Sequence, residues 1–282
     1  MQVDFHVHTN FSDGILTPEE ILKACVDKKL DAVGICDHWG TSKYSDKFQV
    51  TDVEKYVSRL KSLRAGYAGL EVHIGLEVDF SNKYGVDVKQ YDYDELNTVD
   101  YILFEHVNTA EVEGNPVDGR SLDELIAIRD NFSIPIGLAH NHFQKNFHGH
   151  EEETIQKLSR NNIFLELCEA EDKGKKVVDK MLLQQMMEIK KNFNSAFEVG
   201  ELLSRMKGDN SGNAVRKKHA EDNKYFFEHF SENTWELIKK YKLPVSISSD
   251  SHKGLEIGKC NTLMPYLQKY DLERQIIFQR NG

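Results

Sequence analysis

The sequence predicts an α/β protein whose parallel strands close, or nearly close, into a barrel covered by helices. Short apolar runs rich in β-branched residues alternate with amphipathic segments, which is typical of parallel strands joined by helices. Seven such strand runs fit within 282 residues, and α/β barrels of about 250 residues form one domain. We therefore expect a single domain over residues 1–282. An open, doubly wound sheet is the structural alternative.

Each predicted strand is a run of four to seven mostly apolar residues. Such runs suit strands that are buried on both faces. The predicted strands are Val3–Val7, Ala32–Cys36, Val72–Val78, Tyr101–His106, Pro135–Ala139, Ile163–Cys168 and Val245–Ser248.

The predicted helices lie between these strands. The first has a defined start, because Thr17 can act as N-cap, Pro18 occupies the first helical position, and Glu20 can reach back to the cap. The others are Val53–Tyr67, Ser121–Asn131, Glu151–Asn161, Val177–Phe193 and Thr234–Tyr241.

One connection is much longer than a single crossover helix requires. About 75 residues separate the sixth and seventh strands, which leaves an insertion at about residues 169–230. Long loops in compact domains are often lids or binding loops. Because the insertion follows a strand end, we expect it on the same face as the candidate site.

Composition excludes several classes of function. With 36 basic and 46 acidic residues the net charge is −10, which argues against an extended nucleic-acid surface or an anionic membrane surface as partner. A small phosphorylated substrate in a local pocket remains compatible with this charge.

The chain shows no long apolar run and no basic leader, so we expect neither a membrane span nor a secretory segment. Its four cysteines are scattered without a CxxC pair, which favours buried thiols in a reducing compartment. We therefore predict a cytoplasmic protein.

Ionisable residues follow most of the predicted strands. Residues i and i+2 of a strand point to one side, so His6 with His8, and Asp250 with His252, each direct two side chains towards one point. The C-terminal strand ends of an α/β barrel open onto one face, where the residues that follow them meet. Nine nitrogen and carboxylate donors would converge there: His6, His8, Asp13, His38, Glu77, His106, His140, Asp250 and His252.

So many buried ionisable groups require a cation, because uncompensated buried charges cost several kcal/mol each. Imidazole and carboxylate donors without thiolate favour a catalytic site for Zn, Mn or Fe. Nine donors are more than one metal ion with a free coordination position needs, so they suggest two or three divalent ions. Glu77 is suited to bridge two of these ions.

The sequence resembles the PHP (polymerase and histidinol phosphatase) superfamily. The resemblance rests on six motifs that span residues 6–252. They are the run from His6 to Gly14, Cys36-Asp37-His38, Gly75-Leu76-Glu77-Val78-Asp79, His106, Ala139-His140 and Ser249-Asp250-Ser251-His252.

This resemblance implies a distorted (β/α)7 barrel with a trinuclear metal centre that hydrolyses phosphoesters. It implies three ligand sets at positions that are all filled in this chain. They are His6, His8, Glu77 and Asp250; Glu77, His106 and His140; and Asp13, His38 and His252.

Within the superfamily, the residues around Glu77 resemble the histidinol-phosphatase branch, whereas Ser12-Asp13-Gly14 resembles the nucleotide phosphoesterases. We expect hydrolysis of a small phosphomonoester by metal-activated hydroxide, with histidinol phosphate as the leading candidate. The alternatives are a nucleotide phosphoesterase or short-oligonucleotide exonuclease, an amidohydrolase-type barrel and a non-catalytic metal-binding protein. An amidohydrolase-type barrel would need a bridging carboxylated lysine and a lone final Asp.

Candidate catalytic residues are Glu77, Asp13, His252 and Asp250, with Asp13 or His252 available to protonate the leaving group. Phosphate binding usually recruits basic side chains beside the metals. The candidates for substrate binding are Arg216, Arg120, His142 and Lys253.

Overall fold

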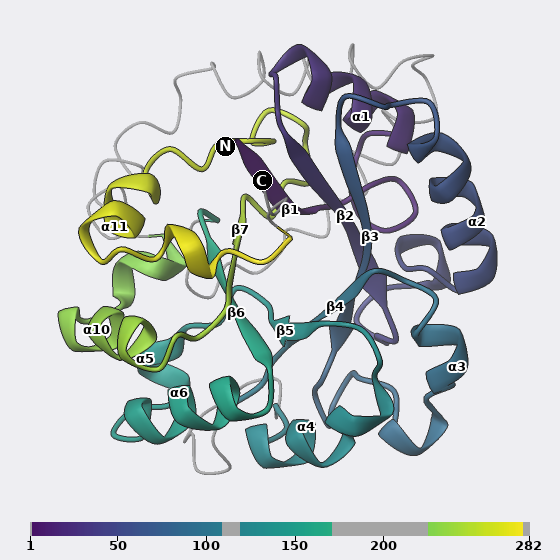
Figure 1. Cartoon of the computed structure of the whole chain (residues 1–282). Coiled ribbons are helices and arrows are strands. Elements are labelled where there is room, and N and C mark those ends of the chain that lie inside the picture. The colour runs from purple at the N-terminus through teal and green to yellow at the C-terminus, as the bar shows by residue number, and fades with distance from the viewer. Residues whose placement is uncertain (1, 109–118, 171–224, 279–282) are drawn as a thin grey trace, which may run out of the picture.

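Seven parallel strands form one sheet whose order follows the chain. The computed structural model describes residues 2–108, 119–170 and 225–278. In this part of the chain the strands surround a common centre and the helices lie outside them (Figure 1). The strands are β1 (Val3–Val7), β2 (Ala32–Trp39), β3 (Glu71–Asp79), β4 (Tyr101–Glu105), β5 (Ile136–Leu138), β6 (Ile163–Cys168) and β7 (Val245–Ser248).

The first and last strands meet at their C-terminal ends and nearly close the barrel. Val7 forms a parallel bridge with Ser251, just beyond β7. The backbone N–H of His8 donates to the Ser251 carbonyl at 3.0 Å, and the Ser251 N–H donates to the His6 carbonyl at 3.3 Å. The predicted (β/α)7 barrel is confirmed, and the open doubly wound sheet is not the observed arrangement.

Five of the eight described α-helices begin at a residue whose side chain caps a free N–H group. Thr17 and Glu20 form the predicted capping box, with Pro18 in the first turn, and Ser121 and Glu124 form a second one. The described α-helices are α1 (Pro18–Asp27), α2 (Val53–Arg64), α3 (Tyr93–Leu96), α4 (Leu122–Ile128), α5 (Phe143–Asn146), α6 (Glu151–Arg160), α10 (Glu232–Lys240) and α11 (Met264–Lys269). The 3₁₀ helices are η1 (Asp46–Phe48), η2 (Val88–Gln90), η3 (Arg129–Asn131), η5 (Phe226–His229) and η6 (Glu273–Gln275).

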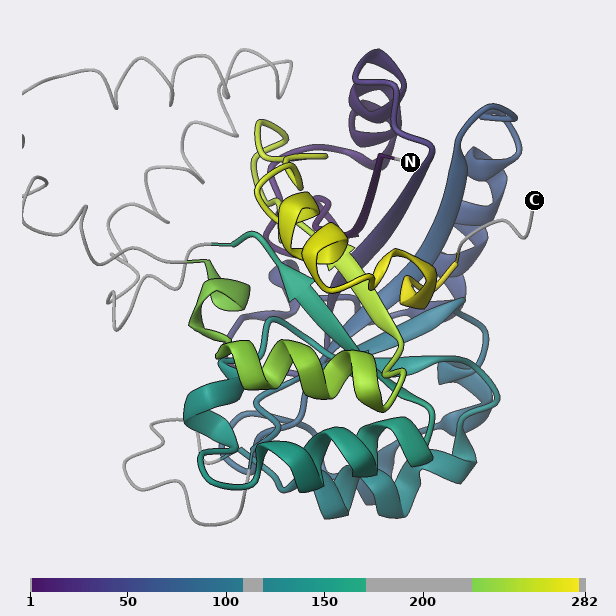
Figure 2. The same ribbon diagram turned by 60° about the vertical axis from the view of Figure 1, so that its left-hand side comes forward.

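Neighbouring helices pack side by side on the outside of the barrel, as α6 and α10 do in Figure 2. Their polar faces are joined by an ion pair between Lys240 and Glu152 (2.8 Å). A hydrogen bond from the Gln156 side chain to the Tyr241 hydroxyl (2.8 Å) lies beside it. Their apolar faces, which include Ile155 and Trp235, are buried against the sheet.

The barrel interior is filled by large side chains, which confines the open end to the C-terminal face. Tyr101 and Phe164 are buried in the centre, and the Tyr101 hydroxyl donates to the Phe5 carbonyl at 2.6 Å. Near the start of β3, Phe278 packs on the rings of Phe5 and His73, with centroids 5.3 and 4.5 Å away. Residues at the opposite, C-terminal ends of the strands are therefore the ones that can meet around a ligand.

Most of the predicted insertion, residues 171–224, lies outside the described residues, together with the predicted helix Val177–Phe193 and Arg216. Its two described ends lie beside each other, because the Phe226 N–H donates to the Ala170 carbonyl at 3.3 Å. The ring of Phe226 lies 5.4 Å from that of His140. The insertion therefore leaves and rejoins the barrel next to a predicted ligand.

No helix in the described ranges has the length and apolar character needed to cross a membrane. The four cysteines are free and buried. A cytoplasmic location stays a prediction.

Candidate metal centre

The strand C-termini bring eight of the nine predicted ligands into one cluster, of which four are buried and four partly buried. The ninth, His106, lies in a neighbouring group with Asp79 and Glu105. The eight clustered residues are His6, His8, Asp13, His38, Glu77, His140, Asp250 and His252.

Glu77, at the end of β3, is the centre of this cluster. Its Oε2 lies 3.4 Å from His6 Nε2, 3.4 Å from His8 Nε2 and 3.0 Å from His38 Nδ1. Its Oε1 lies 2.7 Å from His140 Nε2. The carboxylate thus presents Oε2 to three imidazoles and Oε1 to a fourth, which is the arrangement expected of a bridging ligand.

Several of these ligand atoms are buried without a hydrogen-bond partner. Buried polar atoms are normally satisfied, so a convergent set of unsatisfied ones requires an explanation. The unsatisfied atoms in this cluster are His6 Nε2, His8 Nε2, Asp13 Oδ1, His38 Nδ1, Glu77 Oε2 and Asp250 Oδ1.

The spacing of these atoms fits metal coordination. Ligands about 2.1 Å from a tetrahedral ion lie about 3.4 Å from one another. His6 Nε2 and His8 Nε2 are each 3.4 Å from Glu77 Oε2, and His8 Nε2 is 3.2 Å from Asp250 Oδ1. The residues present therefore fit a divalent cation, with donors that suit Zn, Mn or Fe.

A second donor group lies towards the surface. Asp13 Oδ1 is 3.2 Å from His252 Nε2, 3.7 Å from His38 Nε2 and 3.6 Å from His8 Nδ1. The side chain of His252 is 30% exposed and that of Asp13 is 17% exposed, whereas His6 and Glu77 are fully buried. His252 is thus the most exposed member of the cluster, and the side chains of His140 (22%) and Asp250 (17%) are also partly exposed.

Buried carboxylates hold the ligand loops in place. Asp37 accepts hydrogen bonds from the Thr9 N–H (2.7 Å) and the Ser12 hydroxyl (2.5 Å), which fixes the loop that carries Asp13. In the same loop a Cβ on Gly14 would lie 2.4 Å from the His8 carbonyl oxygen, so only glycine fits there.

Where β1 and β7 meet, Asp4 of β1 fixes the segment that follows β7. Its carboxylate accepts from the Ser249 N–H (2.9 Å), the Ser249 hydroxyl (2.6 Å) and the Gly258 N–H (2.8 Å). Between these anchors Asp250 adopts a φ of 50°, a left-handed conformation that is uncommon for residues other than glycine. Such strain is typical of functional sites, where the surrounding structure enforces it.

Glu166, in β6, orients two ligands from behind. Its Oε1 lies 2.8 Å from His6 Nδ1, and its Oε2 accepts the backbone N–H of His140. A carboxylate on the far nitrogen of a metal-binding histidine fixes the ring and its tautomer. His6 can therefore present Nε2 to a cation while Nδ1 binds Glu166.

We expect Glu166→Gln to weaken metal binding by about 10- to 100-fold, because partners of this kind contribute that much to metal affinity. The variant keeps the shape of the side chain but removes its charge. Titration of the metal-free protein with Zn²⁺ or Mn²⁺ measures the effect, with Glu152→Gln on the outer surface as control. Equal affinities for the two variants would show that Glu166 does not support the centre.

The close contacts between imidazoles and carboxylates shift the pKa values of the cluster strongly. Burial lowers the pKa of His140, but Glu77 raises it more, to about 10. Burial also lowers the pKa of His38 and of His252, and the facing carboxylates raise them to about 9 and about 10. Burial raises the pKa of Glu77, yet the surrounding imidazoles hold it well below its usual range.

We expect metal binding at pH 7 to release protons. Imidazoles whose pKa values lie near 9 or 10 are protonated at this pH, and a metal ligand must be deprotonated. The metal affinity should therefore rise between pH 6 and pH 8. Calorimetric titration in two buffers of different ionisation enthalpy measures the release, and identical apparent enthalpies in the two buffers would contradict it.

The neighbouring group contains His106 and two residues outside the set of nine predicted ligands, Asp79 and Glu105. His106 Nε2 lies 2.8 Å from Glu105 Oε2 and contacts the ammonium of Lys43. Glu105 also belongs to a group with Glu77 and His140. In the structure, Glu105 is therefore the β4 residue that lies beside these two predicted ligands, and the role of His106 as a metal ligand stays a prediction.

The alternation of side chains along β4 is the signal that indicates Glu105. Tyr101 and Leu103 point into the barrel, and Glu105 follows them at the same spacing of two. A charged residue within an apolar strand, such as Glu166 in β6, is a comparable signal. Lys43 lies in a loop that has no such pattern.

The predicted substrate contacts lie in different surroundings. Arg120 hydrogen-bonds the Asn82 side chain (3.1 Å) and the Val86 carbonyl (3.3 Å), and the ring of His142 stacks on His229 at 4.4 Å. Lys253 directly follows the candidate ligand His252. Arg216 lies outside the described residues, and a role in substrate binding stays a prediction for all four.

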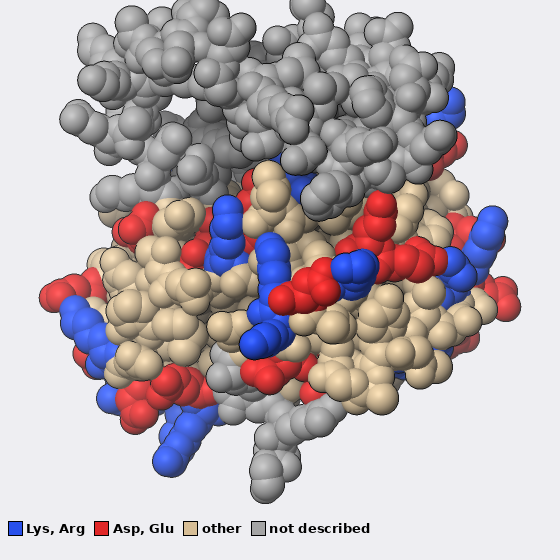
Figure 3. Space-filling model, turned by 90° about the horizontal axis from the view of Figure 1, so that it is seen from above, with Lys and Arg blue, Asp and Glu red and all other residues tan. Residues whose placement is uncertain are grey.

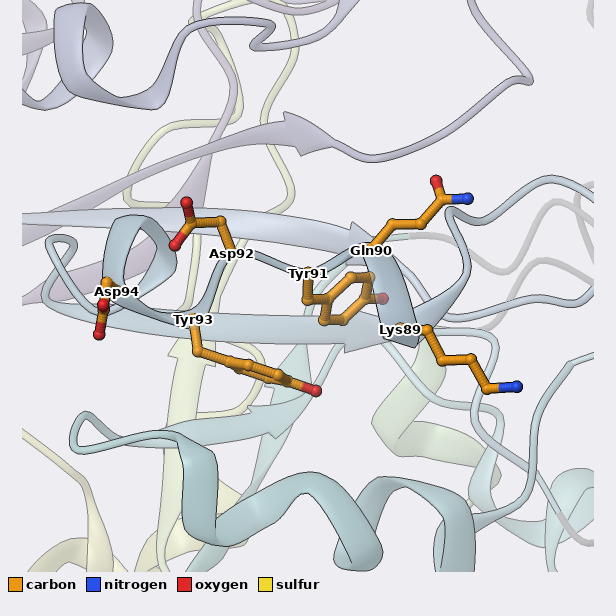
Figure 4. Close-up of a pocket in the computed structure, with 6 residues that line it drawn as sticks. All are labelled: Lys89, Gln90, Tyr91, Asp92, Tyr93 and Asp94. Carbon is orange, nitrogen blue, oxygen red and sulfur yellow. The ribbon is translucent and has the colours of Figure 1, made fainter.

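A separate surface hollow lies away from the cluster. It is lined by six consecutive residues, Lys89 to Asp94, from η2 and the start of α3 (Figure 4). None of these six belongs to a described group of potential metal ligands. The hollow therefore does not contribute to the candidate centre.

Fold and donor set together define an α/β barrel with a candidate metal centre at the C-terminal ends of its strands. Residues 4–241 match the PHP domain family, and the chain belongs to this family.

Two curated relatives match part of the chain. An uncharacterized protein, MJ1295, of Methanocaldococcus jannaschii is 33% identical over 78 residues, 28% of this chain and 34% of that protein. The DNA polymerase/3'-5' exonuclease PolX of Bacillus subtilis is 25% identical over 100 residues, 36% of this chain and 17% of that protein. The matches thus span about a third and a sixth of these two proteins.

Among solved structures, the chain is similar to the histidinol phosphate phosphatase HisK of Lactococcus lactis subsp. lactis, whose crystal structure holds Zn, L-histidinol and phosphate. The TM-score is 0.55 at 13% identity, over 95% of this chain and 93% of that one. At this identity the likeness supports the fold.

Proposed function

We propose that the protein is a metal-dependent phosphoesterase that hydrolyses a small phosphomonoester. The observation that carries the proposal is the convergence of unsatisfied, buried imidazole and carboxylate atoms on one open barrel face. Membership of the PHP domain family supports the same chemistry. Histidinol phosphate is our first candidate substrate, because the fold is similar to that of a histidinol phosphate phosphatase.

His6, His8, Glu77 and Asp250 would hold one divalent ion, and Asp13, His38 and His252 a second, as the distances between their atoms allow. Glu77 and His140 would contribute to a third, with a ligand from the end of β4. When bound, such ions activate water for attack on phosphorus and offset the charge that develops on the phosphoryl oxygens.

The protein's own residues would orient the ligands and the leaving group. Glu166 and Asp37 hold the ligand-bearing segments from behind, so the donors need little rearrangement. Asp13 and His252 form the more exposed pair, 3.2 Å apart. As ligands of the second ion both residues would be deprotonated, so we assign to this pair the positioning of the leaving group at the exposed side of the cluster and not its protonation.

The distribution of charge on one face of the molecule favours a small substrate over a nucleic acid. On the face drawn in Figure 3, Lys and Arg side chains lie among Asp and Glu side chains. Together with the net charge of −10, this mixture does not favour an extended nucleic-acid partner.

A nucleotide phosphoesterase or short-oligonucleotide exonuclease is the second candidate. It is favoured by the partial match to a protein named DNA polymerase/3'-5' exonuclease. It is also favoured by Asp13 of the second donor group, because the run Ser12-Asp13-Gly14 resembles the nucleotide phosphoesterases.

A hydrolysis screen of the metal-loaded protein distinguishes the candidates, with free phosphate measured for the phosphomonoesters and shortened products measured for the oligonucleotide. Histidinol phosphate, nucleotide monophosphates, p-nitrophenyl phosphate and a short oligonucleotide are compared with the same protein after chelation. We expect metal-dependent release from a phosphomonoester. Hydrolysis of the nucleotide monophosphates alone or of the oligonucleotide alone would favour the second candidate, and hydrolysis of none of them would contradict a phosphoesterase.

A further inference from the structure

Lys43 lies inside a group of side chains that otherwise resembles a metal site. Its Nζ is 2.7 Å from Glu105 Oε1 and 3.2 Å from Asp79 Oδ2, and it contacts His106 Nε2. These three partners make up one of the four described groups whose ligand atoms lie within 4.8 Å of one another. A cation already occupies the centre of this group, and it is a lysine ammonium.

The loop that carries Lys43 is held in place by hydrogen bonds on both sides. The Thr41 N–H donates to Gln49 Oε1 at 3.0 Å, and the Lys43 N–H donates to the Thr41 hydroxyl at 3.1 Å. The Ser42 N–H donates to the Tyr84 carbonyl at 2.8 Å. The Lys43 side chain is only 19% exposed. The ammonium is therefore built into this position and is not a freely moving surface charge.

The polar atoms around Lys43 have hydrogen-bond or ion-pair partners, whereas several in the cluster of eight predicted ligands, here called the main cluster, do not. Asp79 accepts from the Thr41 hydroxyl (2.7 Å) and the Ser81 N–H (3.1 Å) in addition to Lys43. Glu105 is paired with Lys43 through one oxygen and with His106 through the other. Among the described candidate ligands, the unsatisfied atoms belong to the eight-residue cluster and not to Asp79, Glu105 or His106.

We propose that the Lys43 ammonium takes the place of a metal ion in the Asp79–Glu105–His106 group and keeps this group free of metal. A divalent ion and an ammonium repel each other strongly at such distances in a poorly hydrated site, so the group holds one or the other. Lys43 is thus a positioning residue. Lys43 fixes the carboxylate of Glu105, which belongs both to the Asp79–Glu105–His106 group and to the group with Glu77 and His140. By occupying the first group, the ammonium limits how many ions the barrel binds.

This inference rests on the proposed function, because it assumes that the main cluster binds metal. Removal of the ammonium leaves two carboxylates and an imidazole whose ligand atoms are already close together. We therefore expect Lys43→Met and Lys43→Ala each to bind one divalent ion more than the native protein. His106→Ala added to Lys43→Met should abolish this gain, because it removes one of the three donors, whereas His106→Ala alone should leave the native count unchanged.

The experiment counts Mn²⁺ or Zn²⁺ per folded chain by native mass spectrometry after equilibration and removal of excess metal. Lys83→Met, which removes a lysine outside the group, is the control and should leave the count unchanged. An unchanged count in the folded Lys43 variants would overturn the inference, and so would a gain that survives His106→Ala. A native protein that binds no metal would instead overturn the proposed function.

Discussion

Glu77→Gln is expected to lose at least one metal ion and to lower kcat by about 10³-fold or more, which corresponds to about 4 kcal/mol of transition-state stabilisation. Glu77 presents Oε2 to three imidazoles of the cluster and Oε1 to His140. An amide of the same shape is neutral and binds cations poorly. The change therefore removes a ligand from two groups at once and leaves the charges of their cations less screened from each other.

Asp79→Asn is the matched control, because Asp79 is also a buried carboxylate of β3 but pairs with Lys43 and Thr41. Its metal content should stay unchanged and its turnover should fall much less. Metal content and kcat are measured for both variants, with circular dichroism to show that each is folded. Near-normal turnover of Glu77→Gln at full metal content would disprove the bridging role. Equal damage in both variants would place Asp79 in the active site.

Removal of the metals is expected to lower the melting temperature by about 10–20 °C. An ion present at a hundred times its Kd stabilises a folded protein by about 2.7 kcal/mol, so two ions contribute about 5 kcal/mol. Each kcal/mol shifts the Tm of a chain of this size by about 2–4 °C. The structural cause is the cluster of buried, unsatisfied donors, which favours the folded state only when a cation compensates it.

Calorimetry of the chelated protein, with and without added Mn²⁺ or Zn²⁺, measures this shift. A variant that lacks two ligands of the main cluster, His6→Ala with His8→Ala, should show a much smaller increase on metal addition. A native protein whose Tm does not respond to metal, although metal binds, would show that the cluster needs no cation for stability.

The sequence predicts most of the barrel because local patterns determine its elements. The strands Val3–Val7, Ile163–Cys168 and Val245–Ser248 are confirmed at both ends, and the capping box of Thr17 and Glu20 is confirmed in detail. β2 continues three residues past its predicted end to Trp39, because its parallel pairing with β3 extends that far. No pattern in the sequence predicts the short helices α3, α5 and α11, because four to six residues carry too little periodicity.

The candidate centre is only partly predictable, because contacts between distant residues have no local signal. Glu166 meets His6 across 160 positions of sequence, and only the closing of the barrel brings them together. At the end of β4, His106 adopts a φ of 63°, which ends the regular alternation of the strand. Spacing alone therefore cannot tell whether His106 or Glu105 lies beside Glu77 and His140.

The central claim is that this barrel face binds metal in order to hydrolyse a phosphoester. Its most direct test is a titration of the metal-free protein with Mn²⁺ or Zn²⁺, in which bound metal and phosphate release from the best phosphomonoester of the screen are measured on the same samples. We predict that phosphate release rises with the bound metal and levels off at two to three equivalents per chain, as the cluster of donors suggests. Phosphate release that does not depend on bound metal, or a protein that binds only a trace of either ion, would contradict the account.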